Sequence, residues 1–529
     1  MTHNFIFKPL TASMLLSLSF FSLSALAAPA AEPGPTAIGN NNPVIDLPED
    51  NDQASELIKR ENQTLLLGNT VPSAKVTDAE AQEAIRSRQQ AGEGLAYDLA
   101  ALKADPVLFT KFLNGALAAQ DMATVKQLLP HYKALEVNDP MLINFADALV
   151  YRSEAKNKQA IAIYREMLAA DPDFHPVRLN MAMAMQADRQ YAAAKEQLQK
   201  LQAADLPPPV MARVQNSLAQ INSLEDWSFN ASASYVRDDN LNDAPSSAIQ
   251  SQLGRSVEQE SGNGIQVSAS ANKRFNLPDN FYATLGGNAS LKGYWDANDY
   301  NDYLFTASAG VGYDDAKNDV SVTPFVTKRI YDEDPYSLRK GVTVSGSRWV
   351  KPQLKLSATG IVSKETFDDD NDANRETDGQ FLGLNALYLK DAKEYFYGGL
   401  GTYRNDVPKS SIISYDRNSL NVGWGREWKK GLSTLATAGY AIKDYDDPAD
   451  AYEPGTGGYL GYYNAVGGEP GTKREDKTTS LGLQIWKRDL SLYGLTPRLV
   501  FEYDKTSSNF GYYDDRTEKL ATIILTKSF

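Results

Sequence analysis

The spacing of apolar residues divides the chain into two regions. Between about residue 76 and residue 224, apolar side chains recur every three or four positions, which is the spacing of amphipathic helices. From Trp227 onward apolar and polar side chains alternate, and the alternation continues to Phe529. Alternation of this kind indicates strands with one apolar face. The sequence therefore predicts an α-helical region followed by a long all-β region.

The β region, residues 226–529, contains fourteen strand-like runs. Its 304 residues give about 22 residues for each run with its loop, which fits transmembrane strands of ~9–11 residues joined by alternating short turns and longer loops. The runs begin at Trp227, Gly264, Phe281, Leu304, Asp319, Gly341, Gln353, Gly379, Glu394, Ser419, Ser433, Thr478, Thr496 and Lys519.

Two features favour a membrane barrel over a soluble sandwich. The polar face of the runs carries Ser, Thr, Gly, Asn and Lys, whereas a soluble barrel of this length needs large apolar residues inside. Aromatic residues lie near the run ends, where a membrane-interface girdle needs them. These are Trp227, Tyr294, Trp295, Trp349, Trp424, Trp428 and Trp486. We therefore expect a 14-stranded antiparallel transmembrane β-barrel.

The helical region, residues 76–224, repeats itself after 34 residues. Small residues at Ala148 and Ala160 recur at Ala182 and Ala194, which allows the two helices of each repeat to approach closely. Together with Tyr151, Tyr164 and Pro172, these spacings are typical of tetratricopeptide (TPR) helix pairs; a generic helical bundle is the alternative. Residues 121–140 resemble the end of a degenerate earlier repeat. LPPPV at 206–210 ends the helical run, and 211–224 is a candidate capping helix.

The N-terminus has the pattern of a secretory signal peptide, residues 1–27. Lys8 precedes an apolar stretch, and Ala25-Leu26-Ala27 supplies small residues for cleavage. An anchor helix is the alternative, although the apolar core is short and rich in serine. Residues 28–75 are rich in Pro, Gly, Asn and Asp, which predicts a flexible arm. No later stretch approaches the ~20 apolar residues of a membrane helix.

Composition argues against several kinds of chemistry. A net charge of −14 disfavours nucleic-acid binding, and the absence of cysteine excludes disulfides. The three histidines, His3, His131 and His175, all precede the β region, which therefore lacks the usual base of hydrolases. The acidic segment 367–374 lacks the EF-hand pattern and is more typical of a solvated loop. We expect no enzyme activity, no cofactor and no metal.

Two segments are candidate contact surfaces. The helix positions that line the concave groove of a TPR array hold Leu142, Phe145, Leu149, Arg152, Leu179, Met183 and Gln186. They predict a groove for an unfolded or extended client, or else burial against neighbouring helices. The loop at 444–471 is rich in Gly, Tyr and Asp, which suits either adaptable protein contacts or an ordinary surface loop.

Both ends of the β region resemble one known family. SASYVRDDNLNDAP at 232–245 and SSNFGYYDDRTEKLATIILTKSF at 507–529 are similar to the barrel ends of the surface lipoprotein assembly modulator (Slam) family, outer-membrane components of the type XI secretion system. A TPR domain before a fourteen-stranded barrel matches the order in that family. The matching positions are Arg237, Asp238, Asp239, Asn240, Asn242, Ala244, Pro245, Ser508, Asn509 and Arg516. They are candidate client contacts, or else turn caps and ion pairs that shape the barrel.

The resemblance implies an outer-membrane protein with its N-terminal domain in the periplasm. Its function would be to translocate or display surface lipoproteins or related secreted proteins. Because a fourteen-stranded barrel is too narrow for a folded protein, a client would cross unfolded, or its strands would pair at an opened seam. Implied partners are the client, the barrel assembly machinery and outer-membrane lipid; a periplasmic chaperone is a further candidate, and no nucleic acid is expected. The alternatives are a diffusion porin with a periplasmic helical arm, and a surface adhesin or host-association factor.

The last run, residues 519–529, is expected to close the barrel by pairing with the run at Trp227. Ala521, Ile523, Leu525 and Lys527 would then face lipid. The resemblance implies that the terminal Phe529 is the signal read by the assembly machinery.

Deletion of Phe529 is accordingly expected to lower the amount of folded barrel in the outer membrane. Heat-modifiable migration of membrane fractions on semi-native gels measures the folded fraction. Unchanged assembly of the truncated protein would contradict this role for Phe529.

Overall fold

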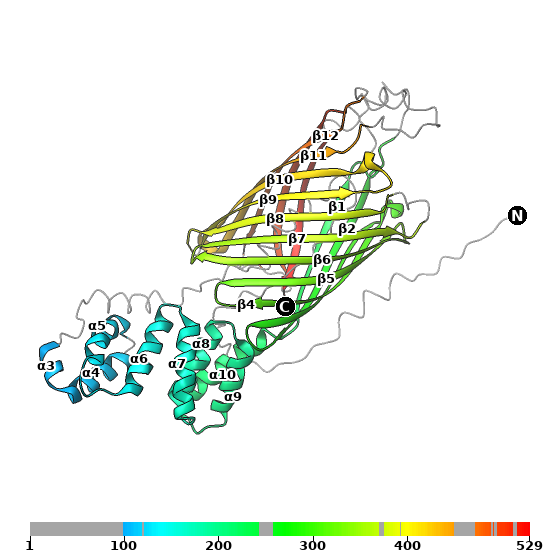
Figure 1. Ribbon diagram of the computed structural model, residues 1–529. Coiled ribbons are helices and arrows are strands. Elements are labelled where there is room, and N and C mark those ends of the chain that lie inside the picture. The colour runs from blue at the N-terminus through cyan, green and yellow to red at the C-terminus, as the bar shows by residue number, and fades with distance from the viewer. Residues whose placement is uncertain are drawn as a thin grey trace. The chain divides into compact units, whose positions relative to one another are not determined.

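The computed structural model describes residues 99–118, 121–242, 258–369, 375–391, 393–448, 471–487, 490, 495–510 and 516–528. The predicted signal peptide and arm, most of the segments 367–374 and 444–471, and the residues Ala244, Pro245 and Phe529 lie outside this description. The described chain begins with α-helices and continues into a closed β-barrel (Figure 1).

Eight α-helices are described. They are α3 (Leu99–Ala104), α4 (Pro106–Ala118), α5 (Met122–Lys133), α6 (Pro140–Ser153), α7 (Asn157–Ala170), α8 (His175–Ala187), α9 (Tyr191–Gln202) and α10 (Pro208–Ser223). The local sequence determines where some of these helices begin. The Asp139 carboxylate accepts from the backbone N–H groups of Met141 and Leu142, and Pro140 follows at the first helical position. No helix in these ranges is long and apolar enough to cross a membrane.

The predicted 34-residue repeat corresponds to two helix pairs, α6 with α7 and α8 with α9. Ala148, Ala160, Ala182 and Ala194 are all fully buried, so these small side chains do lie where the helices approach one another. α10 buries Val214 and Ile221 against the same core, as expected of a capping helix.

The β region forms one closed antiparallel barrel of fourteen strands, as predicted. They are β1 (Ser228–Asp238), β2 (Gly262–Asn276), β3 (Phe281–Tyr294), β4 (Asp302–Asp314), β5 (Asn318–Tyr331), β6 (Asp334–Lys351), β7 (Leu354–Phe367), β8 (Thr377–Leu389), β9 (Glu394–Asp406), β10 (Tyr415–Glu427), β11 (Leu432–Tyr445), β12 (Glu475–Lys487), β13 (Thr496–Ser508) and β14 (Arg516–Ser528).

β6 begins seven residues before the run predicted to start at Gly341. Asp332 and Glu333 both have positive φ, 52° and 63°, so a two-residue hairpin loop joins β5 directly to β6. Two polar residues after this turn, Ser337 and Arg339, are buried on the inner face of the strand. Arg339, for example, forms an ion pair there with Glu365 of β7.

The two faces of the barrel wall differ in polarity, as expected of a membrane barrel. On β5, Val320 and Val322 are 48% and 41% exposed, whereas Ser321 and Thr323 between and beside them are 3% and 5% exposed. Apolar side chains therefore point outward and hydroxyls inward. The closing strand follows the same rule, because Ile523 of β14 is 53% exposed on the outer face.

Connections at the two ends of the barrel differ in length. At one end five of the six connections have two to four residues, as between Asn276 and Phe281 or Lys351 and Leu354, and the connection between β12 and β13 has eight. At the other end most connections are longer, and β11 and β12 are separated by residues 446–474. Outer-membrane barrels have short turns on the periplasmic side and long loops outside. The helical region enters β1 at the short-turn end.

The barrel closes through a short ladder between β1 and β14. Only five residue pairs join them among the described residues, Asn230–Ser234 with Ser528–Ile524. Every other pair of neighbouring strands shares eleven to fourteen pairs. The closure predicted between residues 519–529 and the run at Trp227 is therefore present.

Because Ala160 is fully buried between packed helices, Ala160→Leu is expected to destabilise the helical domain by about 1–3 kcal/mol. Ala162→Leu is the matched control, since Ala162 is exposed on the same helix. Thermal loss of helical circular dichroism in the full-length, detergent-solubilised protein measures the effect. Equal melting of the two variants would contradict the packing described for α7.

Candidate functional site

A groove of about 600 Å³ lies along the helical domain between α6, α8 and α10. It is lined by Arg152, Met183, Gln186, Ala187, Pro209, Ala212, Arg213, Asn216, Ser217 and Gln220. The Gln186 side-chain amide donates to the Gln220 side-chain oxygen at 3.1 Å, and the Arg152 guanidinium donates to the Asn180 side-chain oxygen at 2.6 Å. Two guanidinium groups and several amides therefore line this surface, which suits a polar or anionic extended segment.

The seven predicted groove residues are divided by the structure. Arg152, Met183 and Gln186 line the groove. Leu142 is 7% exposed and belongs to the apolar core of the first helices. The other three, Phe145, Leu149 and Leu179, are partly buried and pack against the domain's two apolar cores. The groove is therefore lined by the C-terminal members of the predicted set on each helix, Arg152 on α6 and Met183 and Gln186 on α8.

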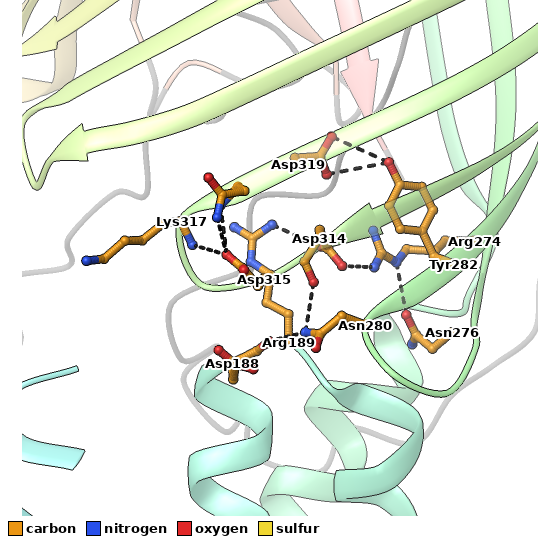
Figure 2. Close-up of polar contacts among 11 residues, drawn as sticks. Asp188, Arg189, Arg274, Asn276, Asn280, Tyr282, Asp314, Asp315, Lys317 and Asp319 are labelled. Carbon is orange, nitrogen blue, oxygen red and sulfur yellow. Dashed lines mark hydrogen bonds and ion pairs between the residues drawn. The ribbon is translucent and has the colours of Figure 1, made fainter. Parts of the chain in front are cut away.

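A second cluster of charged residues joins the helical domain to the barrel (Figure 2). Arg189, in the turn between α8 and α9, forms an ion pair with the Asp314 carboxylate at 3.0 Å. Arg274 of β2 pairs with the other oxygen of the same carboxylate at 2.8 Å. The Asp314 side chain is only 2% exposed. Its buried charge is therefore compensated partly by the helical domain and partly by the barrel.

Two turns of unusual backbone geometry meet at this cluster. Arg189 has a φ of 61°, and Ala155 has a φ of 56° at the same position of the preceding repeat, 34 residues earlier. On the barrel side Asn280, in the turn between β2 and β3, has a φ of 68°. Its buried side-chain amide donates to the backbone oxygens of Asp188 and Asp314. The two turns are therefore held by hydrogen bonds as well as by charge.

A third contact is made by Lys158 of α7. Its ammonium donates to the Tyr313 hydroxyl at 2.9 Å and to the Asp315 carboxylate at 3.1 Å. Although burial alone would raise the pKa of Asp315, backbone N–H groups of Lys317 and Asn318, together with Lys158, hold that pKa at about 2. Burial raises the pKa of Asp188 in the neighbouring turn. Asp315 is therefore the charged partner of Lys158 at neutral pH.

The matching residues at the start of the barrel lie at the long-loop end of β1. Arg237 is exposed on the outer face and pairs with Asp239 at 2.8 Å. The Asp238 carboxylate accepts from the backbone N–H of Asn240 at 2.9 Å. Asn242 bridges to the other side of the loop, because its amide donates to the Glu258 backbone oxygen and its carbonyl accepts from the Glu260 N–H. These contacts shape the loop around the end of β1.

The family-matching residues at the end of the barrel also form hydrogen bonds to the backbone of their loop. The Asn509 side chain accepts from the Glu475 N–H at 2.8 Å and donates to the Lys473 backbone oxygen at 2.8 Å. The Ser508 hydroxyl accepts from the Phe510 N–H at 3.2 Å. Asn509 therefore ties the end of β13 to the start of β12. Arg516 is the first residue of β14.

Comparison with known proteins identifies the family. Residues 227–529 match the family described as surface lipoprotein assembly modifier, and residues 95–198 match the N-terminal TPR repeats described for the same family. The chain belongs to the surface lipoprotein assembly modifier family. It is an outer-membrane protein, in agreement with its apolar outer face.

Three relatives illustrate the similarity. Surface lipoprotein assembly modifier 1 of Neisseria meningitidis serogroup B is 28% identical over 87% of this chain and 91% of the relative. The surface lipoprotein assembly modifier of Pasteurella multocida is 27% identical over 78% of this chain and 82% of the relative. The hemophilin secretion modulator of Acinetobacter baumannii is 22% identical over 77% of this chain and 82% of the relative.

The contacts between the helical domain and the barrel were not predicted from the sequence. Arg189 and Asp314 lie 125 residues apart, and each looks like an ordinary charged residue beside a turn. The 34-residue repeat does place Arg189 in the turn equivalent to the one at Ala155. A charged residue at a repeat turn is too common to indicate a partner by itself.

Arg189→Glu is expected to weaken the contact between the helical domain and the barrel by about 2–5 kcal/mol, because it removes a partner of the buried Asp314 and adds a like charge. Hydrogen–deuterium exchange of the turn at 277–280 should accelerate in the full-length protein. Arg165→Glu makes the same charge change on the exposed face of α7 and should leave exchange unaltered. Equal exchange in both variants would show that this ion pair does not hold the contact.

Proposed function

We propose that this protein translocates or displays a partner protein at the cell surface. The client would be a surface lipoprotein or a related secreted protein, engaged by the helical domain on the periplasmic side, and the barrel would provide its route across the membrane. The names of the relatives support both client classes, since they refer to surface lipoproteins and to the secretion of hemophilin.

The observation that carries this proposal is the connection between groove and barrel. The groove lies on α6, α8 and α10, and the turn after α8 is bonded to the short-turn end of the barrel. Short turns mark the periplasmic side of outer-membrane barrels. A client in the groove would therefore lie beside the barrel on the side from which exported proteins arrive.

The chemistry of the groove supports a chain without defined tertiary structure. Arg213 is exposed on its wall, and Asn216 and Gln220 add amide groups along α10. Amides can bond to any backbone, while guanidinium groups favour carboxylates. The groove would accordingly bind an extended client segment through its backbone, with a preference for acidic residues.

The proposed transport has no chemical energy source at the outer membrane, which has no ATP supply. A fourteen-stranded barrel is too narrow for a folded protein. Inward-facing residues narrow it further, among them the ion pair of Arg339 with Glu365 and a cluster of buried aromatic rings that includes Phe381 and Tyr415. The client would therefore cross unfolded and be drawn outward by folding at the surface, without catalysis by the barrel.

Other partners follow from the same proposal. The barrel assembly machinery would insert the chain through the signal at Phe529. Outer-membrane lipid would cover the apolar outer wall, where Val320 and Ile523 are exposed. A periplasmic chaperone would deliver the client to the groove in unfolded form.

The test compares surface proteins of the parent strain with those of a strain lacking this gene. Deletion is expected to remove one or a few proteins from the protease-accessible surface while leaving them present in the cell. Arg213→Glu should lower display of the same proteins several-fold, because it reverses a charge on the groove wall. Arg165→Glu, outside the groove, should not.

The alternative functions give different results. A diffusion porin would show large, steady conductance in planar bilayers, and its deletion would leave surface proteins in place. An adhesin acting through residues 444–471 would lose host binding, but not client display, when that loop is deleted. Unchanged surface proteins in the deletion strain would contradict the proposed function.

A further inference from the structure

The ladder that closes the barrel ends halfway along the two strands. Its last pair is Ser234 with Ile524, yet β1 continues to Asp238 and β14 begins at Arg516. In the same register Tyr235 would face Ile523, but no such pair forms between these described residues. The seam between β1 and β14 is therefore paired at its short-turn half and lacks ladder pairs at its long-loop half.

The missing pairs do not reflect fraying of β1 or β14. On its other side β1 pairs with β2 along its whole length, up to Asp238 with Gly262. β14 likewise pairs with β13 up to Arg516, opposite Thr506. Both strands therefore keep extended geometry beyond the last seam pair. Their facing edges are two ordered strand edges and not frayed ends.

A side chain marks the point where the two strands part. The Thr522 hydroxyl donates to the backbone oxygen of Tyr235 at 3.1 Å, where a main-chain donor of β14 would otherwise be expected. In the hydrocarbon region a backbone polar group without a partner is costly, so barrels normally pair every strand edge. An open edge is also a ready template for another strand.

We propose that the long-loop half of the β1–β14 seam binds an extended strand of the client, which pairs with the backbone edges of β1 and β14. This inference rests on the proposed function and specifies the route: the client leaves at the seam and does not thread the closed lumen. Backbone pairing needs no particular client sequence, only alternation of apolar residues toward lipid and polar residues inward.

The side chains around the edge fit such an occupant. Tyr235 of β1 is 48% exposed, and Ala521 and Ile523 of β14 are exposed on the same outer face. An added strand would place alternate apolar side chains beside them, in the pleated spacing of about 4.8 Å between strands. Lengthening the opening toward the short-turn side would break only the five existing pairs, fewer than at any other strand boundary.

The absence of native cysteine allows the seam to be locked by a disulfide. The double variant Ser232→Cys/Thr526→Cys joins two directly opposed residues within the paired half. Thr478→Cys/Thr506→Cys is the matched control, because these residues are opposed on β12 and β13 with their hydroxyls 2.9 Å apart. The readout is surface display of the proteins that the deletion strain loses.

A client that enters from the short-turn side must separate the five existing pairs to reach the open half of the seam. Under oxidising conditions the seam lock is therefore expected to lower display at least ten-fold, and a reductant should restore it. The control lock should display at the wild-type level in both states. Restoration by reductant shows that the variant is folded. Full display from the oxidised seam lock would overturn this inference alone, as would equal loss from both locks. A deletion strain that loses no surface protein would instead overturn the proposed function, and this inference with it.

The occupant is identified by photo-crosslinking. Tyr235, at the open edge, is replaced by p-benzoylphenylalanine, and Tyr440 of β11 serves as control. Tyr440 is similarly exposed on the outer face, at 43%, but is paired with neighbouring strands on both sides. A client lost in the deletion strain should crosslink at Tyr235 and not at Tyr440. A crosslink from Tyr235 only to a second copy of this chain, or only to lipid, would contradict a client strand as the occupant.

Discussion

A backbone inside a lipid bilayer must find its hydrogen-bond partners within the protein, and most of this structure depends on that constraint. It explains why the β region forms one closed barrel and why its closure matters more than any other strand boundary. Thirteen of the fourteen boundaries satisfy the constraint with long ladders. The boundary between β1 and β14 meets it only in part, with five pairs and a hydroxyl bond from Thr522. The weakest closure therefore lies where both ends of the β region meet.

The junction between the helical domain and the barrel depends on a different physical term, the cost of burying charge. Asp314 lies at the end of β4 and is almost inaccessible to water. Arg274 pairs with one oxygen of this carboxylate from within the barrel. The second arginine comes from the helical domain, so Asp314 is fully compensated only when the domains are in contact. The Asp314 carboxylate has one arginine partner in the helical domain and one in the barrel. A small displacement of the helical domain would remove one of these partners, so the contact favours one position.

Much of the fold could be predicted because it follows from periodic patterns. Ala148, Ala160, Ala182 and Ala194 indicated the repeat by spacing alone, and the fourteen runs of alternating polarity indicated the barrel. The start of β6 was missed because positive φ at Asp332 and Glu333 cannot be deduced from their polarity. Two acidic residues followed by further polar residues are typical of a longer loop, although here Asp332 and Glu333 form a two-residue hairpin loop.

The candidate site was less predictable, for a related reason. Helical spacing identifies a face but not what covers it, so Leu142 of the core and Met183 of the groove looked equivalent. The partners of Arg189 depend on contacts between residues far apart in the chain. The matching residues at the barrel ends were found by resemblance, and the structure shows Asn242 and Asn509 bonding loop backbones.

The groove, the contact between helical domain and barrel, and the seam together offer a way for transport of the client to be directed outward without an energy source. The groove is tied to the short-turn end, whereas the open half of the seam lies at the long-loop end. A client strand can therefore gain these backbone partners only after it has passed the paired half of the seam. Each new pair with β1 or β14 would oppose return of the strand to the periplasm. Folding outside would then release the edges, and Thr522 could resume its bond to Tyr235. A seam that was fully paired would offer no such partners, and one without its five remaining pairs would not hold the barrel closed between transport events.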